Sequence, residues 1–236
     1  MKPTLVIPMY NESSILPDTL CQTAEYMERE FPEGYEIIFS NDGSTDDSRA
    51  IVDEFAKTHP NTRSAGYEKN RGKGCAVRTG VLEANGDVII CTDCDLAYGL
   101  DVIRRAVDIF AAKPATELVI GSRRLEKDGY EGYTFIRKFA SRTYLKCLAI
   151  AAGFKLSDSQ CGFKCYRSGA AKQIFEGCEV DGFAFDFEVL IRAQKFGMEI
   201  TEMPVRIINH RESKVHVFRD SIKMLRDIAA IKKRNK

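Results

Sequence analysis

The 236-residue sequence lacks any run of the roughly 18–20 apolar residues that a helix needs to cross a bilayer. Its most apolar stretch, residues 144–156, is broken by Lys146, Gly153 and Lys155. No signal-peptide cleavage site follows the N-terminus, which runs from Met1 directly into a strand-like segment. We therefore expect a protein that begins in the cytosol and encodes no transmembrane anchor.

The cysteines lack the regular spacing of a disulfide framework, and without a secretion signal they are expected to stay reduced. Cys91 and Cys94 have the spacing of half a zinc knuckle, but no second Cys or His pair completes a four-ligand site. They also fall at the end of a predicted strand, where the pair would point in unsuitable directions. Structural zinc is therefore not favoured.

Three common catalytic patterns are also missing. Without a G-x-G-x-x-G motif, a dinucleotide-dependent oxidoreductase has little support. The segment NRGKG at 70–74 is not a Walker loop, because no Ser or Thr follows its Gly-Lys pair. The three histidines have neither metal-ligand spacing nor a Ser or Cys partner in a recognisable motif, so a hydrolase triad is not supported.

The net charge of +1 conceals an uneven distribution. Residues 204–236 carry ten Lys/Arg and three Asp/Glu, a net of +7, whereas the first 203 residues carry 25 basic and 31 acidic residues, a net of −6. This basic tail on an acidic body predicts contact with an anionic partner. The tail lacks interleaved aromatic residues, so nucleic acid is not the favoured partner.

Apolar residues make up 44% of the chain, which supports one sizeable core and excludes bulk disorder. Strands are expected at 4–9, 36–40, 63–67, 87–92 and 117–121, alternating with helices at 16–30, 46–57, 74–85 and 100–112. Further along we expect helices at 135–153, 187–196 and 217–236, a strand at 163–166 and extended chain at 200–209. The alternation predicts an α/β fold with a mainly parallel sheet covered on both faces.

Ligands of such sheets bind outside the carboxyl ends of the strands, so the loops after residues 9, 40, 92 and 121 are the candidate site. Asp93 and Asp95 stand two residues apart and would face the same side of an extended segment, where two carboxylates attract a hard divalent cation. The alternative is that they only end a strand and cap the next helix. Asp42 can likewise be a plain turn residue. The glycines and Lys73 at 70–74, before a predicted helix, suit a phosphate or another anion.

The ordered segments VIPMYNE (6–12), DGSTD (42–46), NRGKG (70–74) and DCD (93–95) resemble the motifs of family 2 glycosyltransferases with the GT-A fold. Downstream, GSR (121–123), DSQCGFK (158–164) and FAFDFE (183–188) resemble the polyprenyl-phosphate hexosyltransferases, closest to the dolichyl-phosphate glucosyltransferase branch. Mannose-transferring relatives carry Gln two residues after the second aspartate, where this chain has Ala97, as in the glucosyl branch. One departure is that many relatives have membrane spans.

The resemblance implies roles for individual residues. It assigns nucleotide-sugar binding to Pro8, Tyr10, Glu12, Asp42, Lys73, Asp93 and Asp95. It makes Asp95 the main ligand of a Mg²⁺ or Mn²⁺ ion, with Asp93 as a second candidate, and it assigns the acceptor phosphate to Arg123, Arg137, Ser141 and Lys214. The catalytic set is Asp95, Asp158, Arg123 and Arg137. Roles outside the site also stay open. Arg137 can be a solvated helix residue, Asp158 a helix cap or turn residue, and Lys214 a surface charge.

We therefore predict a single GT-A domain over 1–236, with a nucleotide-sugar half (1–122), an acceptor half (123–214) and a basic amphipathic helix (215–236). The predicted enzyme is a metal-dependent, inverting hexosyltransferase that moves glucose from UDP-glucose onto a polyprenyl or dolichyl phosphate. Alternatives are another sugar (mannose or N-acetylglucosamine), a soluble glycan acceptor, or a non-catalytic nucleotide-sugar-binding module.

The basic helix predicts peripheral binding to an anionic membrane on its cytoplasmic face. It can equally pack on its own domain. A membrane-protein partner or a homo-oligomer stays open.

Overall fold

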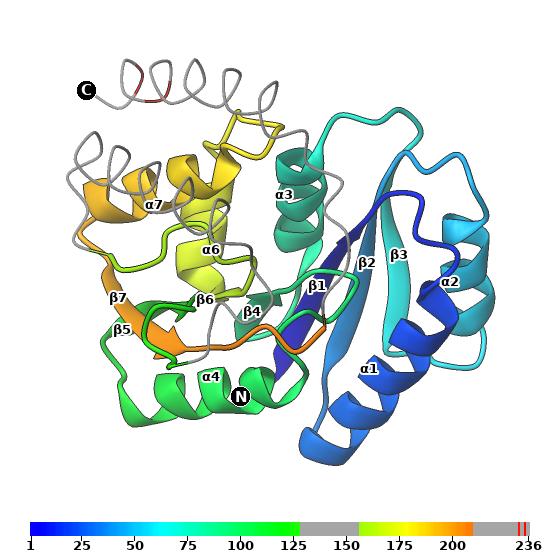
Figure 1. Cartoon of the computed structure of the whole chain (residues 1–236), viewed down its shortest axis with the longest axis horizontal. Coiled ribbons are helices and arrows are strands. Elements are labelled where there is room, and N and C mark those ends of the chain that lie inside the picture. The colour runs from blue at the N-terminus through cyan, green and yellow to red at the C-terminus, as the bar shows by residue number, and fades with distance from the viewer. Residues whose placement is uncertain (128–155, 210–230, 232–233, 235–236) are drawn as a thin grey trace.

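The computed structural model describes residues 1–127, 156–209, 231 and 234. Its centre is one seven-stranded mixed sheet with the strand order β3-β2-β1-β4-β6-β5-β7, covered by helices on both faces (Figure 1). Among the described residues, no helix is both long and apolar enough to cross a membrane.

The first half of the chain forms the predicted alternation. Its strands are β1 (Pro3–Met9), β2 (Glu36–Asp42), β3 (Thr62–Tyr67), β4 (Val88–Cys91) and β5 (Thr116–Ser122). Its helices are α1 (Leu16–Glu30), α2 (Ser48–Ala56), α3 (Lys73–Glu83) and α4 (Asp101–Ala112). All of these elements confirm the prediction, and α1, α2 and α4 each bury the apolar face that their periodicity indicates.

The second half departs more from expectation. It contains β6 (Lys164–Arg167), α6 (Ser168–Phe175), α7 (Phe185–Lys195) and β7 (Glu199–Pro204). Helix α6 was not predicted; it follows β6 directly, with no turn residues between them to mark its start. The predicted helix 135–153 and all of 217–236 except Ile231 and Arg234 lie outside the described residues.

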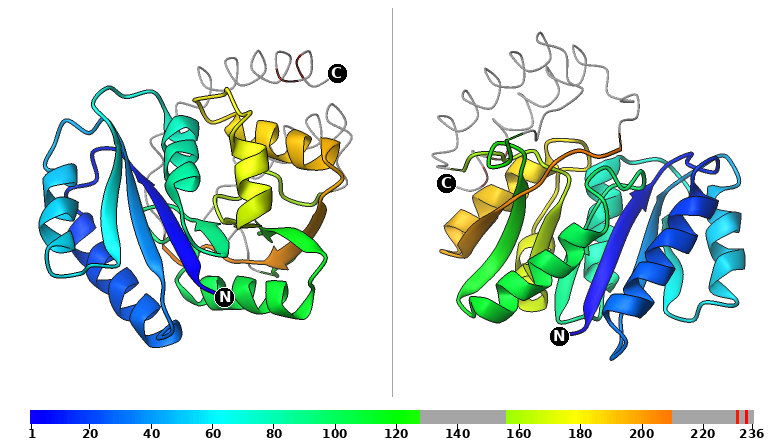
Figure 2. Two further views of the ribbon diagram at one scale, coloured as in Figure 1. Left: turned by 180° about the vertical axis from the view of Figure 1, so that it is seen from behind. Right: turned by 60° about the horizontal axis from the view of Figure 1, so that its bottom comes forward.

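Alternate residues of each strand enter two separate cores. On β1, Leu5 and Ile7 join the core under α1 and α4, whereas Val6 joins the core under α3, α6 and α7. Figure 2 shows the blue α1 and the green α4 on one side of the sheet. The fully buried Ile231 belongs to the second core. Both faces of the sheet are thus apolar, as the sequence predicted.

Strand direction decides which loops meet. Strands β1, β2 and β4 are parallel, so their carboxyl ends share one edge of the sheet. Strand β6 runs antiparallel to β4 and β5, and its first residue, Lys164, pairs with Cys91 at the end of β4. The reversal brings the segment before β6 to the edge where β4 ends. The parallel and the reversed strands therefore both contribute to one candidate site.

Candidate active site

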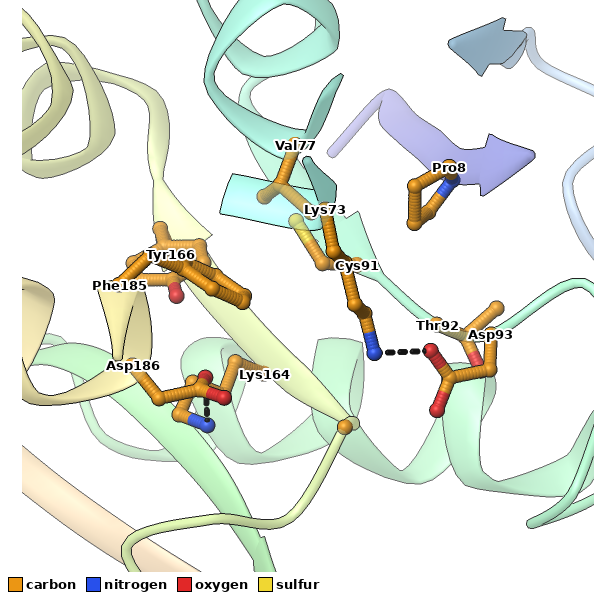
Figure 3. Close-up of a pocket in the computed structure, with 11 residues that line it drawn as sticks. Pro8, Lys73, Val77, Cys91, Thr92, Asp93, Lys164, Tyr166, Phe185 and Asp186 are labelled. Carbon is orange, nitrogen blue, oxygen red and sulfur yellow. Dashed lines mark hydrogen bonds and ion pairs between the residues drawn. The ribbon is translucent and has the colours of Figure 1, made fainter. Parts of the chain in front are cut away.

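The carboxylate of Asp93 lies at the centre of the candidate site. Its Oδ1 accepts a hydrogen bond of 2.5 Å from the ammonium of Lys73, the first residue of α3 (Figure 3). A Cβ at residue 162 would lie 2.3 Å from Asp93 Oδ2, so a larger residue there would displace this carboxylate from its position. Burial alone would raise the pKa of Asp93, but the charges of Lys73, Lys164 and Arg123 outweigh it and lower the pKa. Neighbouring cationic side chains therefore hold the Asp93 carboxylate in place.

Asp95 has a different environment. Because β4 ends at Cys91, Asp93 and Asp95 lie in a turn and not in the extended segment that the sequence suggested. Asp95 accepts a hydrogen bond from the backbone N–H of Ala97 at 3.1 Å, but among the described residues no ion pair involves it. Burial and the nearby carboxylates of Asp93 and Glu12 raise its pKa. The turn thus carries surplus negative charge that a cation would neutralise.

The donor set at this turn is small. Within residues 1–127, 156–209, 231 and 234, no group of three or more His, Cys, Asp or Glu side chains could hold a metal ion. Two carboxylates suit a hard cation that completes its shell with water and substrate phosphates. Cys91 and Cys94 are not a zinc pair, because their thiols enter opposite cores.

A small pocket lies between α3 and the start of α7. Its lining includes Pro8, Lys73, Asp93, Lys164 and Asp186 (Figure 3). The Lys164 side chain is 3% exposed and donates to Asp186 Oδ1 at 2.5 Å and to the Cys161 carbonyl at 2.6 Å. The sequence placed Lys164 in a motif without assigning it a role. A lysine that begins an apolar strand is the signal that could have identified it.

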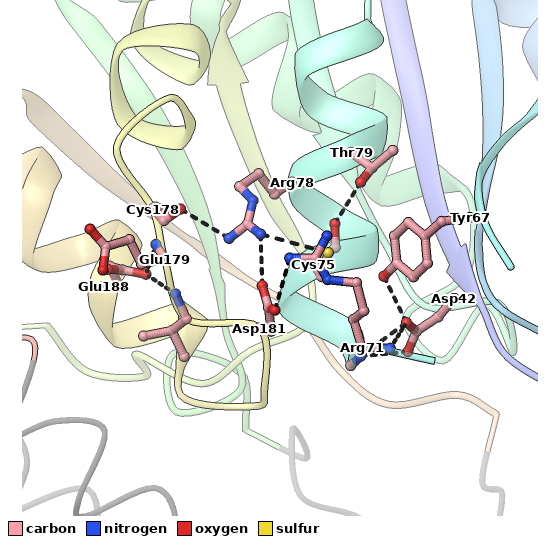
Figure 4. Close-up of polar contacts among 12 residues, drawn as sticks. Asp42, Tyr67, Arg71, Cys75, Arg78, Thr79, Cys178, Glu179, Asp181 and Glu188 are labelled. Atoms are coloured by element: carbon pink, nitrogen blue, oxygen red, sulfur yellow. Dashed lines mark hydrogen bonds and ion pairs between the residues drawn. The ribbon is translucent and has the colours of Figure 1, made fainter. Parts of the chain in front are cut away.

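Asp42 organises the loop before α3. Its carboxylate accepts hydrogen bonds from Tyr67 Oη at 2.7 Å, Asn70 Nδ2 at 2.9 Å and the backbone N–H groups of Arg71 and Gly72 at 2.9 Å (Figure 4). These contacts fix the 70–74 loop against the end of β2. The backbone N–H groups of Arg71 and Gly72 thus already donate to a protein carboxylate. Contact of Asp42 with a nucleotide stays a prediction.

The end of β1 supplies Pro8, and the loop after it supplies Tyr10 and Glu12. Pro8 lines the pocket, and Tyr10 is one of the exposed large side chains. The backbone N–H of Glu12 donates to Ser48 Oγ at 2.8 Å, which joins this loop to the start of α2. Asn11, with φ at 51°, donates its backbone N–H to Ser44 Oγ at 3.0 Å. The loops after β1 and β2 therefore form one connected surface beside the Asp93 turn.

Arg123 and Asp158, predicted separately, form one buried ion pair. Arg123 Nε donates to Asp158 Oδ2 at 2.6 Å and Nη2 donates to Oδ1 at 2.9 Å. The side chains are 11% and 0% exposed. Burial alone would raise the pKa of Asp158, but hydrogen bonds and charge from Arg123 lower it. Ser157, whose N–H donates to Glu202 Oε1 at 2.8 Å, attaches this segment to β7.

The structure thus brings together Lys73 with Asp93, and Arg123 with Asp158, around the carboxyl edge of the sheet. The other predicted acceptor-phosphate residues, Arg137, Ser141 and Lys214, lie outside the described residues. Their roles stay predictions, as do the nucleotide contacts. The two carboxylates at the start of α7 are both engaged: Asp186 by Lys164, and Glu188 by the backbone N–H of Val180 at 2.7 Å.

The chain is also similar to known proteins over most of its length. The family model "Glycosyl transferase family 2" matches residues 4–175. A dolichyl-phosphate beta-glucosyltransferase of Trichomonas vaginalis is 35% identical over 97% of this chain and 70% of its own length. One from Dictyostelium discoideum is 30% identical over 97% of this chain and 73% of its own length.

Among solved structures, glucosyl-3-phosphoglycerate synthase of Mycobacterium tuberculosis in complex with Mn²⁺, UDP-glucose and glycerol 3-phosphate aligns with a TM-score of 0.69. The alignment covers 98% of this chain and 79% of that one, at 18% sequence identity. At this identity the likeness concerns the fold alone, and the predicted GT-A fold is confirmed.

Proposed function

The chain belongs to glycosyltransferase family 2, and from that membership we propose that it transfers glucose from UDP-glucose to a dolichyl or shorter polyprenyl phosphate. The observation that carries the proposal is the similarity to dolichyl-phosphate beta-glucosyltransferases over 97% of the chain. The site adds support, since carboxylates and cationic side chains meet at one edge of the sheet.

The Asp93 turn is the proposed donor side. Asp95, with Asp93, would hold a divalent cation, Mg²⁺ or Mn²⁺, which offsets the negative charge on the leaving diphosphate when bound. The surplus negative charge at Asp95 fits such an ion. Lys73 holds Asp93 in place and contributes a positive charge beside the expected position of the diphosphate. The loops after β1 and β2 would bind the uridine.

The proposed acceptor side is the Arg123–Asp158 pair. A phosphate oxygen of the lipid forms the new bond to C1 of glucose, and the bond from C1 to the UDP oxygen breaks with its electron pair leaving on UDP. The phosphate is already an anion near neutral pH, so the step needs no strong base. Asp158 holds the Arg123 guanidinium in one orientation, which would align the phosphate without proton transfer.

The place of action is proposed to be the cytoplasmic face of a membrane. The net of +7 on residues 204–236 supports it, because basic segments bind anionic leaflets. In this arrangement the protein binds peripherally and meets the lipid phosphate at the surface.

A transfer assay tests the proposal. UDP-glucose, UDP-N-acetylglucosamine and GDP-mannose are each incubated with a short polyprenyl phosphate or with glycerol 3-phosphate, in Mg²⁺ or Mn²⁺. We expect glucose transfer to the polyprenyl phosphate only. Preference for another donor or for the soluble phosphate would refute the stated substrates. Calorimetric binding of UDP-glucose without turnover would instead indicate a binding module.

A further inference from the structure

The carboxylate of Asp181 bridges two arginines, Arg71 in the loop before α3 and Arg78 within α3 (Figure 4). Its Oδ1 accepts a hydrogen bond from Arg78 Nη2 at 2.7 Å, and its Oδ2 accepts one from Arg71 Nη2 at 3.1 Å. Arg78, 16% exposed, also donates to the carbonyl of Cys178 at 2.9 Å. These contacts join positions a hundred or more residues apart in the sequence.

The backbone makes the same connection. The Asp181 carbonyl accepts the N–H of Cys75 at 3.2 Å, so residue 181 caps the first turn of α3. A Cβ at residue 72 would lie 2.5 Å from the Asp181 carbonyl oxygen, and one at residue 74 would lie 2.5 Å from that of Val180. The glycines of the NRGKG segment therefore leave room for the backbone of residues 178–181 to pack closely against the start of α3.

The two segments joined by Asp181 are the two walls of the pocket. One wall is α3, which contributes Lys73 and Val77. The other begins four residues after Asp181, where the start of α7 contributes Phe185 and Asp186. Lys73 holds Asp93 from the first wall, and Asp186 holds Lys164 from the second. The distance between the walls sets how these groups face a ligand.

We propose that Asp181 is a positioning residue that clamps the two pocket walls together and so sets Lys73 and Asp93 in their working positions. In its kinetic part the inference rests on the proposed glucosyl transfer. Asp181 acts through Arg71 and Arg78, and the site it orders is the one that would receive the donor. Loss of the clamp lets the walls separate, and misplacement of reacting groups by about 1 Å costs up to about a hundredfold in rate.

The test compares Asp181→Ala, which removes both ion pairs, with Asp181→Asn, which keeps one acceptor oxygen. Asp108→Asn is the matched control, because it removes an exposed ion pair with Arg104 on α4. Calorimetric titration with UDP gives the affinity and the fraction of binding-competent protein. We expect Asp181→Ala to lower kcat per UDP-binding site at least about tenfold, with the Kd for UDP within about threefold. Asp181→Asn should fall between wild type and Asp181→Ala, and the control should match wild type.

Hydrogen exchange in the free protein supplies a readout that does not depend on activity. In Asp181→Ala, amide exchange should accelerate in residues 72–76 and 178–182 and stay unchanged in β1 and β2. If kcat falls only in proportion to the binding-competent fraction, or if exchange is unaltered, the clamp is refuted. If wild-type protein neither binds UDP nor transfers glucose, the proposed function fails, and the exchange result alone decides the clamp.

Discussion

Two ion pairs of the candidate site, Lys73–Asp93 and Arg123–Asp158, differ in their access to solvent. The Lys73 and Asp93 side chains are 28% and 31% exposed and line the pocket, whereas those of Arg123 and Asp158 are 11% and 0% exposed. A partly exposed pair can exchange partners when a ligand arrives. A buried pair with two parallel hydrogen bonds keeps its geometry. If the proposed roles hold, the donor side responds to its ligand and the acceptor side is built in advance.

The largest effect is expected for Asp95→Ala, a substitution in the turn beside the more exposed Lys73–Asp93 pair. We expect transfer to fall at least about a thousandfold, equivalent to about 4 kcal/mol in the activation barrier. The melting temperature should change by less than about 2 °C, since removing a surplus carboxylate leaves no buried charge unpaired. Steady-state transfer and thermal unfolding measure the two effects. Full activity with divalent ions present would show that the cation assignment is wrong.

Asp158→Asn, unlike Asp95→Ala, should have a large effect on the stability of the fold. Removing one partner of a buried pair leaves the other charge uncompensated, which costs about 3–5 kcal/mol. Denaturant unfolding of the variant and wild type at pH 7 measures the loss. Asp108→Asn, which breaks an exposed pair, should cost less than about 1 kcal/mol. If both variants cost the same, Arg123–Asp158 is not the rigid element that its burial indicates.

Lys73→Met should lower transfer by about tenfold to a hundredfold, which is about 1.4–2.7 kcal/mol in the barrier. Its cost in stability should stay below about 1 kcal/mol, because the pair is partly exposed to solvent. Arg49→Met removes the more exposed pair with Glu68 and serves as a control that should retain activity. Equal losses of transfer in both variants would mean that the Lys73–Asp93 pair has no special role.

A smaller effect is expected in the pH dependence of the unfolding free energy, which reports on the buried Arg123–Asp158 pair. Because Arg123 lowers the pKa of Asp158 in the folded state, the pair stabilises the fold fully above the usual Asp pKa of about 3.9. This contribution is lost as pH falls through the lowered folded pKa. The difference in unfolding free energy between wild type and Asp158→Asn should therefore shrink below about pH 4. A difference that is constant from pH 7 to pH 3 would contradict the assignment.

Much of the fold could be predicted because the first half of the chain encodes each element locally. The apolar run before Thr92 fixes the end of β4, and with it the place of Asp93 and Asp95. The pairing of Arg123 with Asp158 could not be read in this way, since it depends on β6 running antiparallel beside β5. Asp181 left no sequence signal, because its partners lie more than a hundred residues away.

The antiparallel β6 also has a consequence for synthesis of the chain. It lies between β4 and β5 in the sheet, although it follows both of them in the sequence. A nascent chain that has reached residue 127 can pair strands β1 to β4 with one another. Strand β5 is then unpaired, because both of its neighbours in the sheet, β6 and β7, have not yet been synthesised. Until residue 167 leaves the ribosome, β4 offers an open edge to other chains. Truncation between β5 and β6 should therefore yield an aggregation-prone fragment and not a half-domain.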